Sequence, residues 1–119
     1  MAILGRFEPD GLIAGDFPTE AQEITITGPA DFKRGDVLGI IASNGRYVLA
    51  DSTANDGSQN VVGIVCDDVT VADGAKAVSN MFIKGEFSHR HLRFGGDGNA
   101  DPHLRRMTEI SLIVRKTRV

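Results

Sequence analysis

The stretch that decides the fold is Val37-Leu38-Gly39-Ile40-Ile41-Ala42-Ser43-Asn44-Gly45-Arg46-Tyr47-Val48-Leu49-Ala50. Two short apolar runs flank the dipeptide Asn44-Gly45 at its centre. Both residues of this dipeptide tolerate the positive φ that a type I′ turn requires, and Asn-Gly between apolar runs is the strongest short-range signal for a hairpin. The stretch therefore predicts two antiparallel strands, Val37–Ala42 and Arg46–Ala50, joined by a tight turn.

Further short apolar runs extend this pattern into a sheet. Apolar and polar residues alternate in Glu23–Thr27, which is rich in β-branched side chains and ends at Gly28-Pro29. Similar runs occupy Val61–Cys66, Ala77–Ile83 and Ile110–Val114. Six or so short strands are expected, so the chain is predicted to be mostly β.

Helical signals are few. Asp101 precedes Pro102, which places a capping carboxylate before a proline at the first helical position and predicts a short helix through Met107. A second short helix over Ser88–Phe94 has weaker support. The 14 glycines and 4 prolines among 119 residues favour turns over long helices. We therefore expect one or two short helices.

The first 21 residues differ from the rest of the chain. They contain apolar side chains but no period of two or 3.6, and glycine or proline interrupts them every few residues. Residues 1–21 are therefore predicted to form an extended N-terminal arm, and residues 22–119 a single β-rich domain. Several large apolar side chains in the arm favour docking, either on the chain's own body or on a partner. These side chains belong to Ile3, Leu4, Phe7, Leu12, Ile13 and Phe17.

The charge of the chain argues against two classes of partner. The net charge is −3, which does not favour binding to nucleic acid or to an anionic membrane, and no window approaches the roughly 20 apolar residues of a membrane span. The charge is also uneven. Residues 1–60 carry 4 basic and 9 acidic groups, whereas residues 61–119 carry 9 basic and 7 acidic groups. Such asymmetry suits contact between copies or with a charged partner.

Few residues suggest catalysis or metal binding. His89 and His91 would share one face of a strand, and His103 could join them around zinc, but Arg90 and Arg93 oppose a cation there. Cys66 is the single cysteine and is expected to be a small buried hydrophobe. No nucleophile, base and orienting group come together in the sequence. We therefore predict no enzyme, no metal site and no cofactor.

Two apolar runs bear on assembly. Val37–Ala42 and Val61–Val65 are apolar on both faces of any strand that they form. A chain of this size has few layers to cover both faces, so self-association is a further hypothesis.

Several blocks of the chain, in this order and spacing, resemble the head decoration proteins of lambda-like tailed bacteriophages and prophages. The arm segment Leu12–Pro18 is similar to the segment that precedes the first strand in many members. Three features depart from the family: His89–His91, the Gly95–Gly98 insertion and the basic C-terminal tail. The similar blocks are Gly35–Gly39, Gly45–Leu49, Asp56–Gln59, Val62–Val65 and Gly85–Phe87.

This resemblance implies a β-clip-like fold and a homotrimer on the outer surface of the virion capsid, made in the host bacterial cytoplasm. The trimer would bind the major capsid protein of the expanded head and stabilise the head against the pressure of packaged DNA, without direct contact with nucleic acid or membrane. The arm would order on binding and add strand-like pairing to the capsid protein. The capsid-binding residues implied in this way are Leu12, Ile13, Ala14, Asp16, Phe17 and Pro18.

An alternative is a biotinyl or lipoyl carrier, or another binding module of the β-sandwich type. Phe32–Leu38 is similar to the opening of such carrier domains, which need an acceptor lysine at a hairpin tip. The lysines are Lys33, Lys76, Lys84 and Lys116, and Ser43-Asn44-Gly45 contains none. The sequence therefore favours the decoration protein.

Overall fold

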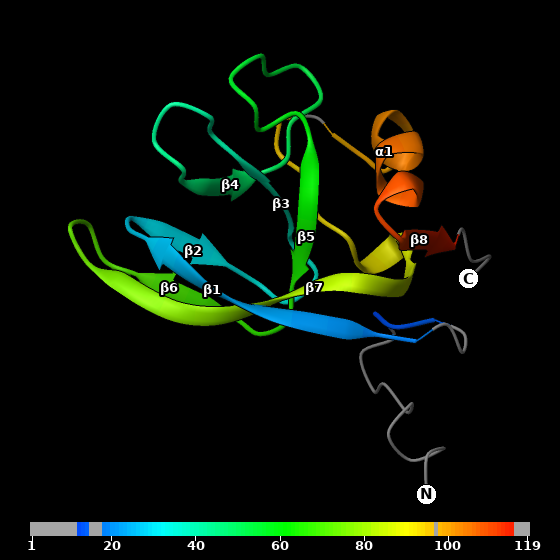
Figure 1. The fold of residues 1–119 in the computed structure, drawn as a ribbon, viewed down its shortest axis with the longest axis horizontal. Coiled ribbons are helices and arrows are strands. Elements are labelled where there is room, and N and C mark those ends of the chain that lie inside the picture. The colour runs from blue at the N-terminus through cyan, green and yellow to red at the C-terminus, as the bar shows by residue number, and fades with distance from the viewer. Residues whose placement is uncertain (1–11, 15–17, 97, 116–119) are drawn as a thin grey trace, which may run out of the picture.

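Eight strands and one short α-helix make up the part of the chain that the computed structural model describes, which is residues 12–14, 18–96 and 98–115 (Figure 1). Short 3-10 turns precede the helix and follow the longest strand. The elements are β1 (Glu20–Thr27), β2 (Ala30–Phe32), β3 (Val37–Ile40), β4 (Tyr47–Leu49), β5 (Val61–Val65), β6 (Val69–Val71), β7 (Lys76–Ser88), η2 (His89–His91), η3 (Asp101–His103), α1 (Leu104–Glu109) and β8 (Leu112–Arg115).

One long strand organises the main sheet. The order of this sheet is β1-β7-β5-β3-β4, with antiparallel neighbours, and β8 joins β7 in parallel. The thirteen residues of β7 pair with β1 along most of their length and with β8 over their last four residues. Strands β2 and β6 form a separate antiparallel pair. The prediction of a mostly-β chain with one or two short helices is confirmed.

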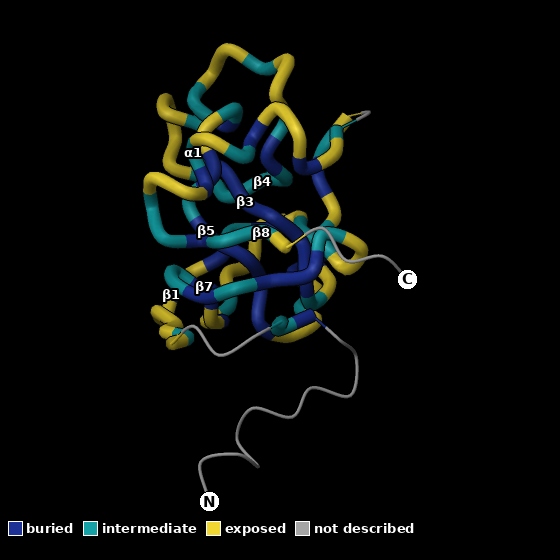
Figure 2. Tube along the Cα trace, turned by 90° about the vertical axis from the view of Figure 1, so that its right-hand side faces the viewer, coloured by how far each residue is buried: buried dark blue, intermediate teal, exposed yellow. Residues whose placement is uncertain are grey.

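Two apolar clusters lie on opposite faces of the main sheet. In β5, Ile64 belongs to one cluster and its neighbour Val65 to the other, as the alternation of side chains along a strand requires. Met107 of α1 and Leu112 of β8 complete the first cluster, whereas Phe32 of β2 and Val71 of β6 complete the second. Figure 2 shows the buried stretches running through the strands, with the exposed residues mainly in the loops.

The chain therefore covers both faces of its apolar strands by itself. Val37 and Leu38 are fully buried on opposite faces of β3, and Val61 and Ile64 are fully buried in β5. Among the described residues, the only large apolar side chain that is well exposed is Val78, at 63%. The two-faced apolar runs are thus explained by intramolecular packing, and they give no separate reason for self-association.

The predicted strands are all present, with shifted ends. β1 begins at Glu20, inside the segment that the sequence assigned to the arm, and β7 runs five residues past the predicted end at Ile83. Two strands were missed, β2 and β6. Each has only three residues, and its pairing partner lies about forty positions away, as with Asp31 and Thr70. A run of that length carries no usable period.

The hairpin between β3 and β4 forms, but the predicted type I′ turn is wrong. Ile41 N–H donates to the carbonyl of Arg46 (2.9 Å), so four residues separate the closing pair. Only Gly45 among them has a positive φ, +73°, because Asn44 stays in the ordinary region and accepts a hydrogen bond from Arg46 N–H through Oδ1 (2.9 Å). The glycine alone supplies the left-handed step of the turn.

The helix signals need two corrections. The segment 88–94 contains only the 3-10 turn η2. In the helix predicted through Met107, Asp101 is not the N-cap, because η3 begins at Asp101 itself and Ala100 is the N-cap. The amide of Asp101 instead donates to Oδ1 of Asn99 (2.9 Å).

Candidate functional site

Part of the N-terminal arm is built into the domain. Ser88 N–H donates to the carbonyl of Leu12, and Ala14 N–H donates to the carbonyl of Glu86, both at 2.8 Å. Ile13 lies between them as the antiparallel partner of Phe87. The side chain of Leu12 is 1% exposed and belongs to the first apolar cluster. We call Leu12–Ala14 the arm root, since it fixes the arm to the end of β7.

The end of β7 is consequently paired on both sides. β8 pairs in parallel with Gly85–Ser88, and Val114 lies opposite Phe87. Since a strand has only two edges, the arm root occupies the edge that β8 leaves open. Phe87 is fully buried beneath this junction, with its ring centroid 5.3 Å from that of Phe82. The arm root, β7 and β8 thus meet at one end of the molecule (Figure 1).

The predicted capsid-binding residues fall into three groups. Leu12, Ile13 and Ala14 form the arm root, where Leu12 is buried and the other two are half-buried. Pro18 is exposed just before β1. Asp16 and Phe17 lie outside the described residues. The sequence did not indicate that Leu12–Ala14 pairs with β7, because three residues beside a glycine show no period.

Basic side chains lie next to the end of β7, the strand with which the arm root pairs. β7 runs directly into η2, where Arg90 and His91 are exposed. The ring Nδ1 of His89 lies 3.3 Å from the carbonyl oxygen of Arg115 at the end of β8. Arg115 Nη1 also donates to Glu86 Oε2 (2.8 Å). We call the exposed residues Arg90, His91 and Arg115, together with His89, the basic corner.

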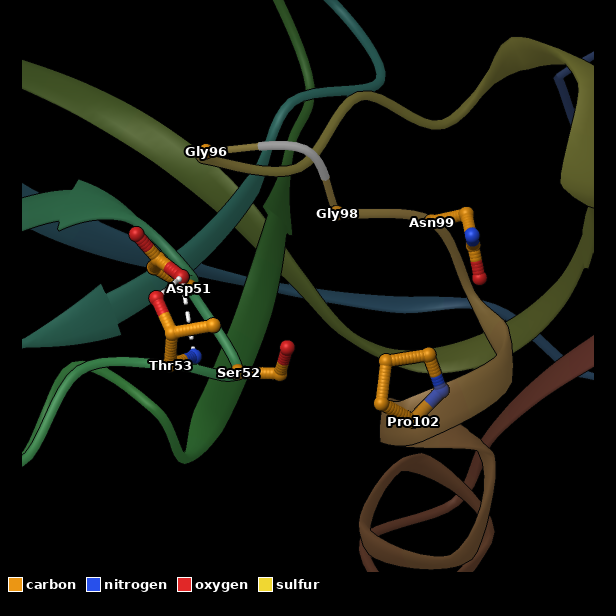
Figure 3. A pocket seen from close by; sticks show the side chains of 7 residues that line it. All are labelled: Asp51, Ser52, Thr53, Gly96, Gly98, Asn99 and Pro102. Atoms are coloured by element: carbon orange, nitrogen blue, oxygen red, sulfur yellow. Dashed lines mark hydrogen bonds between the residues drawn. The ribbon is translucent and has the colours of Figure 1, made fainter.

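A second candidate site is a pocket of about 270 Å³ between two loops (Figure 3). Asp51 Oδ1 accepts hydrogen bonds from the amide of Thr53 (2.9 Å) and from its hydroxyl (2.7 Å). These hydrogen bonds, the hydroxyl's first, lower the pKa of Asp51. The carboxylate is thus committed to its own loop, and the described lining residues supply no second acid or base to work with it. The lining residues are Asp51, Ser52, Thr53, Gly96, Gly98, Asn99 and Pro102.

The three histidines do not form one site. His103 is 2% exposed and stacks on Phe94, with ring centroids 4.8 Å apart and planes 7° from parallel, whereas His89 and His91 lie in η2 at the surface. Burial lowers the pKa of His103, and its Nε2 has no hydrogen-bond partner within the described part of the chain. Across those residues no group of three or more histidine, cysteine or acidic side chains is placed to hold a metal ion.

Cys66 is buried at the end of β5, as expected from the sequence. Burial, with a smaller contribution from Asp67, raises the pKa of its thiol to about 11. A thiol in this state is a weak nucleophile at neutral pH.

Within the described ranges, no helix has the length and hydropathy needed to cross a membrane.

The fold and the arm root define a small β-rich domain with an N-terminal segment anchored at one end. The profile of the family described as bacteriophage lambda head decoration protein D matches residues 5–104, which is 100 of the 119 residues. The chain therefore belongs to this family. A search of the curated proteins found no match.

The family match confirms the resemblance seen in the sequence. The protein is a phage head decoration protein, a member of a family of structural proteins of the phage capsid. Binding to the capsid and association with the virion follow from membership of this family. The matched region ends at Leu104, so β8 and the basic tail lie beyond it.

Proposed function

We propose that this protein binds the outer surface of the expanded phage head as homotrimers and stabilises the head against the pressure of packaged DNA. Its partners in this proposal are two further copies of itself and the major capsid protein. No catalysis, cofactor, nucleic acid or membrane takes part. The observation that carries the proposal is the family match over residues 5–104, together with an N-terminal segment that already pairs as a strand.

The arm is the proposed contact with the capsid protein, through Leu12, Ile13, Ala14, Asp16, Phe17 and Pro18. The pairing of Ile13 with Phe87 supports this, because it shows that the segment can adopt the extended conformation that strand addition uses. Strand addition supplies main-chain hydrogen bonds, and side-chain pockets supply specificity. Many copies on one shell add avidity, so each contact can be weak.

Stabilisation would follow from mass action. A ligand that binds only the expanded shell stabilises that state by an amount that grows with the logarithm of its concentration over its dissociation constant. A trimer that spans neighbouring capsid subunits also resists their separation. The protein would therefore raise the temperature and the internal pressure that a filled head withstands.

The proposal is tested by mixing the purified protein with expanded and unexpanded heads of its phage. We expect regular protrusions on expanded heads only, by electron microscopy, and a threefold mass by light scattering after size exclusion. A monomeric mass would contradict the trimer, and bare expanded heads would contradict decoration. A variant that lacks residues 2–11 keeps the arm root and serves to test the rest of the arm.

A further inference from the structure

We infer that the basic corner is a recognition surface for a carboxylate-rich segment of the shell protein. The inference rests on the proposed function, since it names the chemistry of the partner that the arm would meet. The arm root ends its pairing at Ser88, and the next residue of β7's chain is His89, the first of η2. A partner that reaches the arm at its root must therefore meet η2.

The corner gathers basic side chains from two segments that are far apart in the sequence. Arg90 and His91 come from η2, and Arg115 comes from the end of β8, held beside His89 at 3.3 Å. The sequence continues from Arg115 with Lys116 and Arg118, which lie outside the described residues. The end of β7, β8 and the arm root lie at the same end of the molecule in Figure 1, and Figure 2 views that end directly.

The cations are not all neutralised within the domain. Glu86 pairs with Arg115, and its side chain is only 15% exposed, so most of that carboxylate is taken up inside the fold. Arg90 is exposed and makes no ion pair with another residue that the structure describes. In a protein with a net charge of −3, Arg90 and Arg115 set against Glu86 leave one positive charge in excess at the corner. Such a local field orients and accelerates encounter with an anionic partner.

A protein carboxylate suits the corner better than a nucleic acid phosphate. Affinity for nucleic acid depends on several Lys or Arg contacts to phosphates, and the net negative charge opposes a long polyanion. A short acidic segment needs few positive charges, and the corner offers the guanidinium groups of Arg90 and Arg115, of which the second also pairs with Glu86. Arg also binds carboxylates through two parallel hydrogen bonds. The corner thus adds charge selectivity to the strand pairing of the arm.

The test compares Arg90→Glu with Lys76→Glu. Lys76 is exposed at the opposite end of β7, so the two variants change the charge equally but at different ends of the molecule. We expect Arg90→Glu to weaken binding to expanded heads by about tenfold or more at low salt, and the difference to shrink as salt screens the contact. Lys76→Glu should bind within about twofold of the wild type, and both variants should keep the wild-type mass.

Equal binding by the two variants would overturn the inference while leaving decoration intact. If the wild type fails to bind expanded heads, the proposed function fails, and the corner is then tested alone with poly-glutamate. In that measurement, NMR shifts at His89–His91 and Arg115 support the inference, and unchanged signals overturn it. Tighter binding of the wild type to duplex DNA than to poly-glutamate would assign the corner to phosphate, and a changed mass of Arg90→Glu would assign it to another copy.

Discussion

Asp36 and Arg93 lie 57 positions apart in the sequence and form a bidentate ion pair. Arg93 Nε lies 2.7 Å from Asp36 Oδ1, and Arg93 Nη2 lies 2.6 Å from Asp36 Oδ2. The Asp36 side chain is 2% exposed and also accepts a hydrogen bond from Lys33 N–H (2.8 Å). The hydrogen bonds to Asp36 raise the pKa of Arg93, so the guanidinium stays charged. Next to the pair, Val37 N–H donates to the Arg93 carbonyl, which ties the segment after η2 to the start of β3.

Replacement of Arg93 by methionine should destabilise the protein by about 2–3 kcal/mol, because Asp36 would stay buried with only one main-chain donor. The loss is smaller than for a fully buried pair, since Arg93 itself is 54% exposed. Arg105→Met is the matched control. Its pair with Glu109 is exposed and one helical turn apart, so its loss should cost at most about 0.5 kcal/mol. Urea unfolding of both variants measures the difference, and equal midpoints would contradict a structural role for the pair.

Leu12→Ala should destabilise the isolated domain by about 2–5 kcal/mol, because Leu12 is part of the first apolar cluster. Deletion of residues 2–11 should leave the thermal midpoint within a degree or two of the wild type, since the arm root stays in place. Differential scanning calorimetry of the two proteins separates the root from the rest of the arm. A Leu12→Ala midpoint equal to that of the wild type would mean that the root is undocked in solution.

Much of the fold could be predicted from the sequence because its strands follow local rules. The alternation in β1 and the apolar runs of β3 and β5 reflect burial on one or both faces of the strand. The pattern of apolar residues within each run is enough to indicate this burial. β2 and β6 could not be predicted in this way, because three-residue strands depend on the partner they find. The extension of β7 to Ser88 has the same origin. Its last residues are strand because β8 and the arm root pair with them.

The candidate site also has one part that the sequence predicted and another that it could not. The sequence predicted an extended arm, and its apolar content indicated docking. The arm root could not be located beforehand, because the partner of Ile13 is Phe87, 74 positions later. The basic corner was visible only as two separate charged segments, His89–His91 and the tail. Parallel pairing of β8 with the end of β7 brings Arg115 beside His89, and no local pattern encodes that topology.

His103 should make the protein less stable in mild acid. Burial lowers its pKa in the folded state below the value of about 6.5 that is usual for histidine, and the unfolded chain titrates near that usual value. Between these two values the unfolded state binds a proton that the folded state does not, so the free energy of unfolding falls as the pH falls through this window. Asp51, the charge that favours protonation of His103, reduces the effect.

Each unit of pKa difference at His103 corresponds to about 1.4 kcal/mol. His103→Phe keeps a ring beside Phe94 and removes the titration, so it isolates the histidine from the carboxylates that titrate at lower pH. Urea unfolding at pH 7 and pH 5 should show a larger loss for the wild type than for this variant. Equal losses would show that His103 is protonated as readily when folded as when unfolded.

Gly39→Ala should be among the most damaging small substitutions in the protein. A Cβ on Gly39 would overlap the backbone carbonyl of Ser58. Because the obstacle is main chain from another segment, no side-chain rotation can relieve the overlap. Gly45→Ala is the matched control, because Gly45 has a positive φ but open space around it. We expect about 1 kcal/mol of strain at Gly45 and a clearly larger loss at Gly39, up to failure to fold. Similar midpoints in urea would contradict the close approach of Ser58.

Cys66 should resist thiol reagents for as long as the domain is folded. With a thiol pKa of about 11, only about one molecule in a thousand carries the thiolate at pH 8, and the side chain is 7% exposed. Reaction with an aromatic disulfide reagent should therefore proceed at the rate at which the chain opens, and Leu12→Ala should accelerate it in proportion to its loss of stability. One thiol per chain should react at once in concentrated guanidinium chloride. Complete labelling of the native wild type within minutes would mean that β5 opens at this point without unfolding.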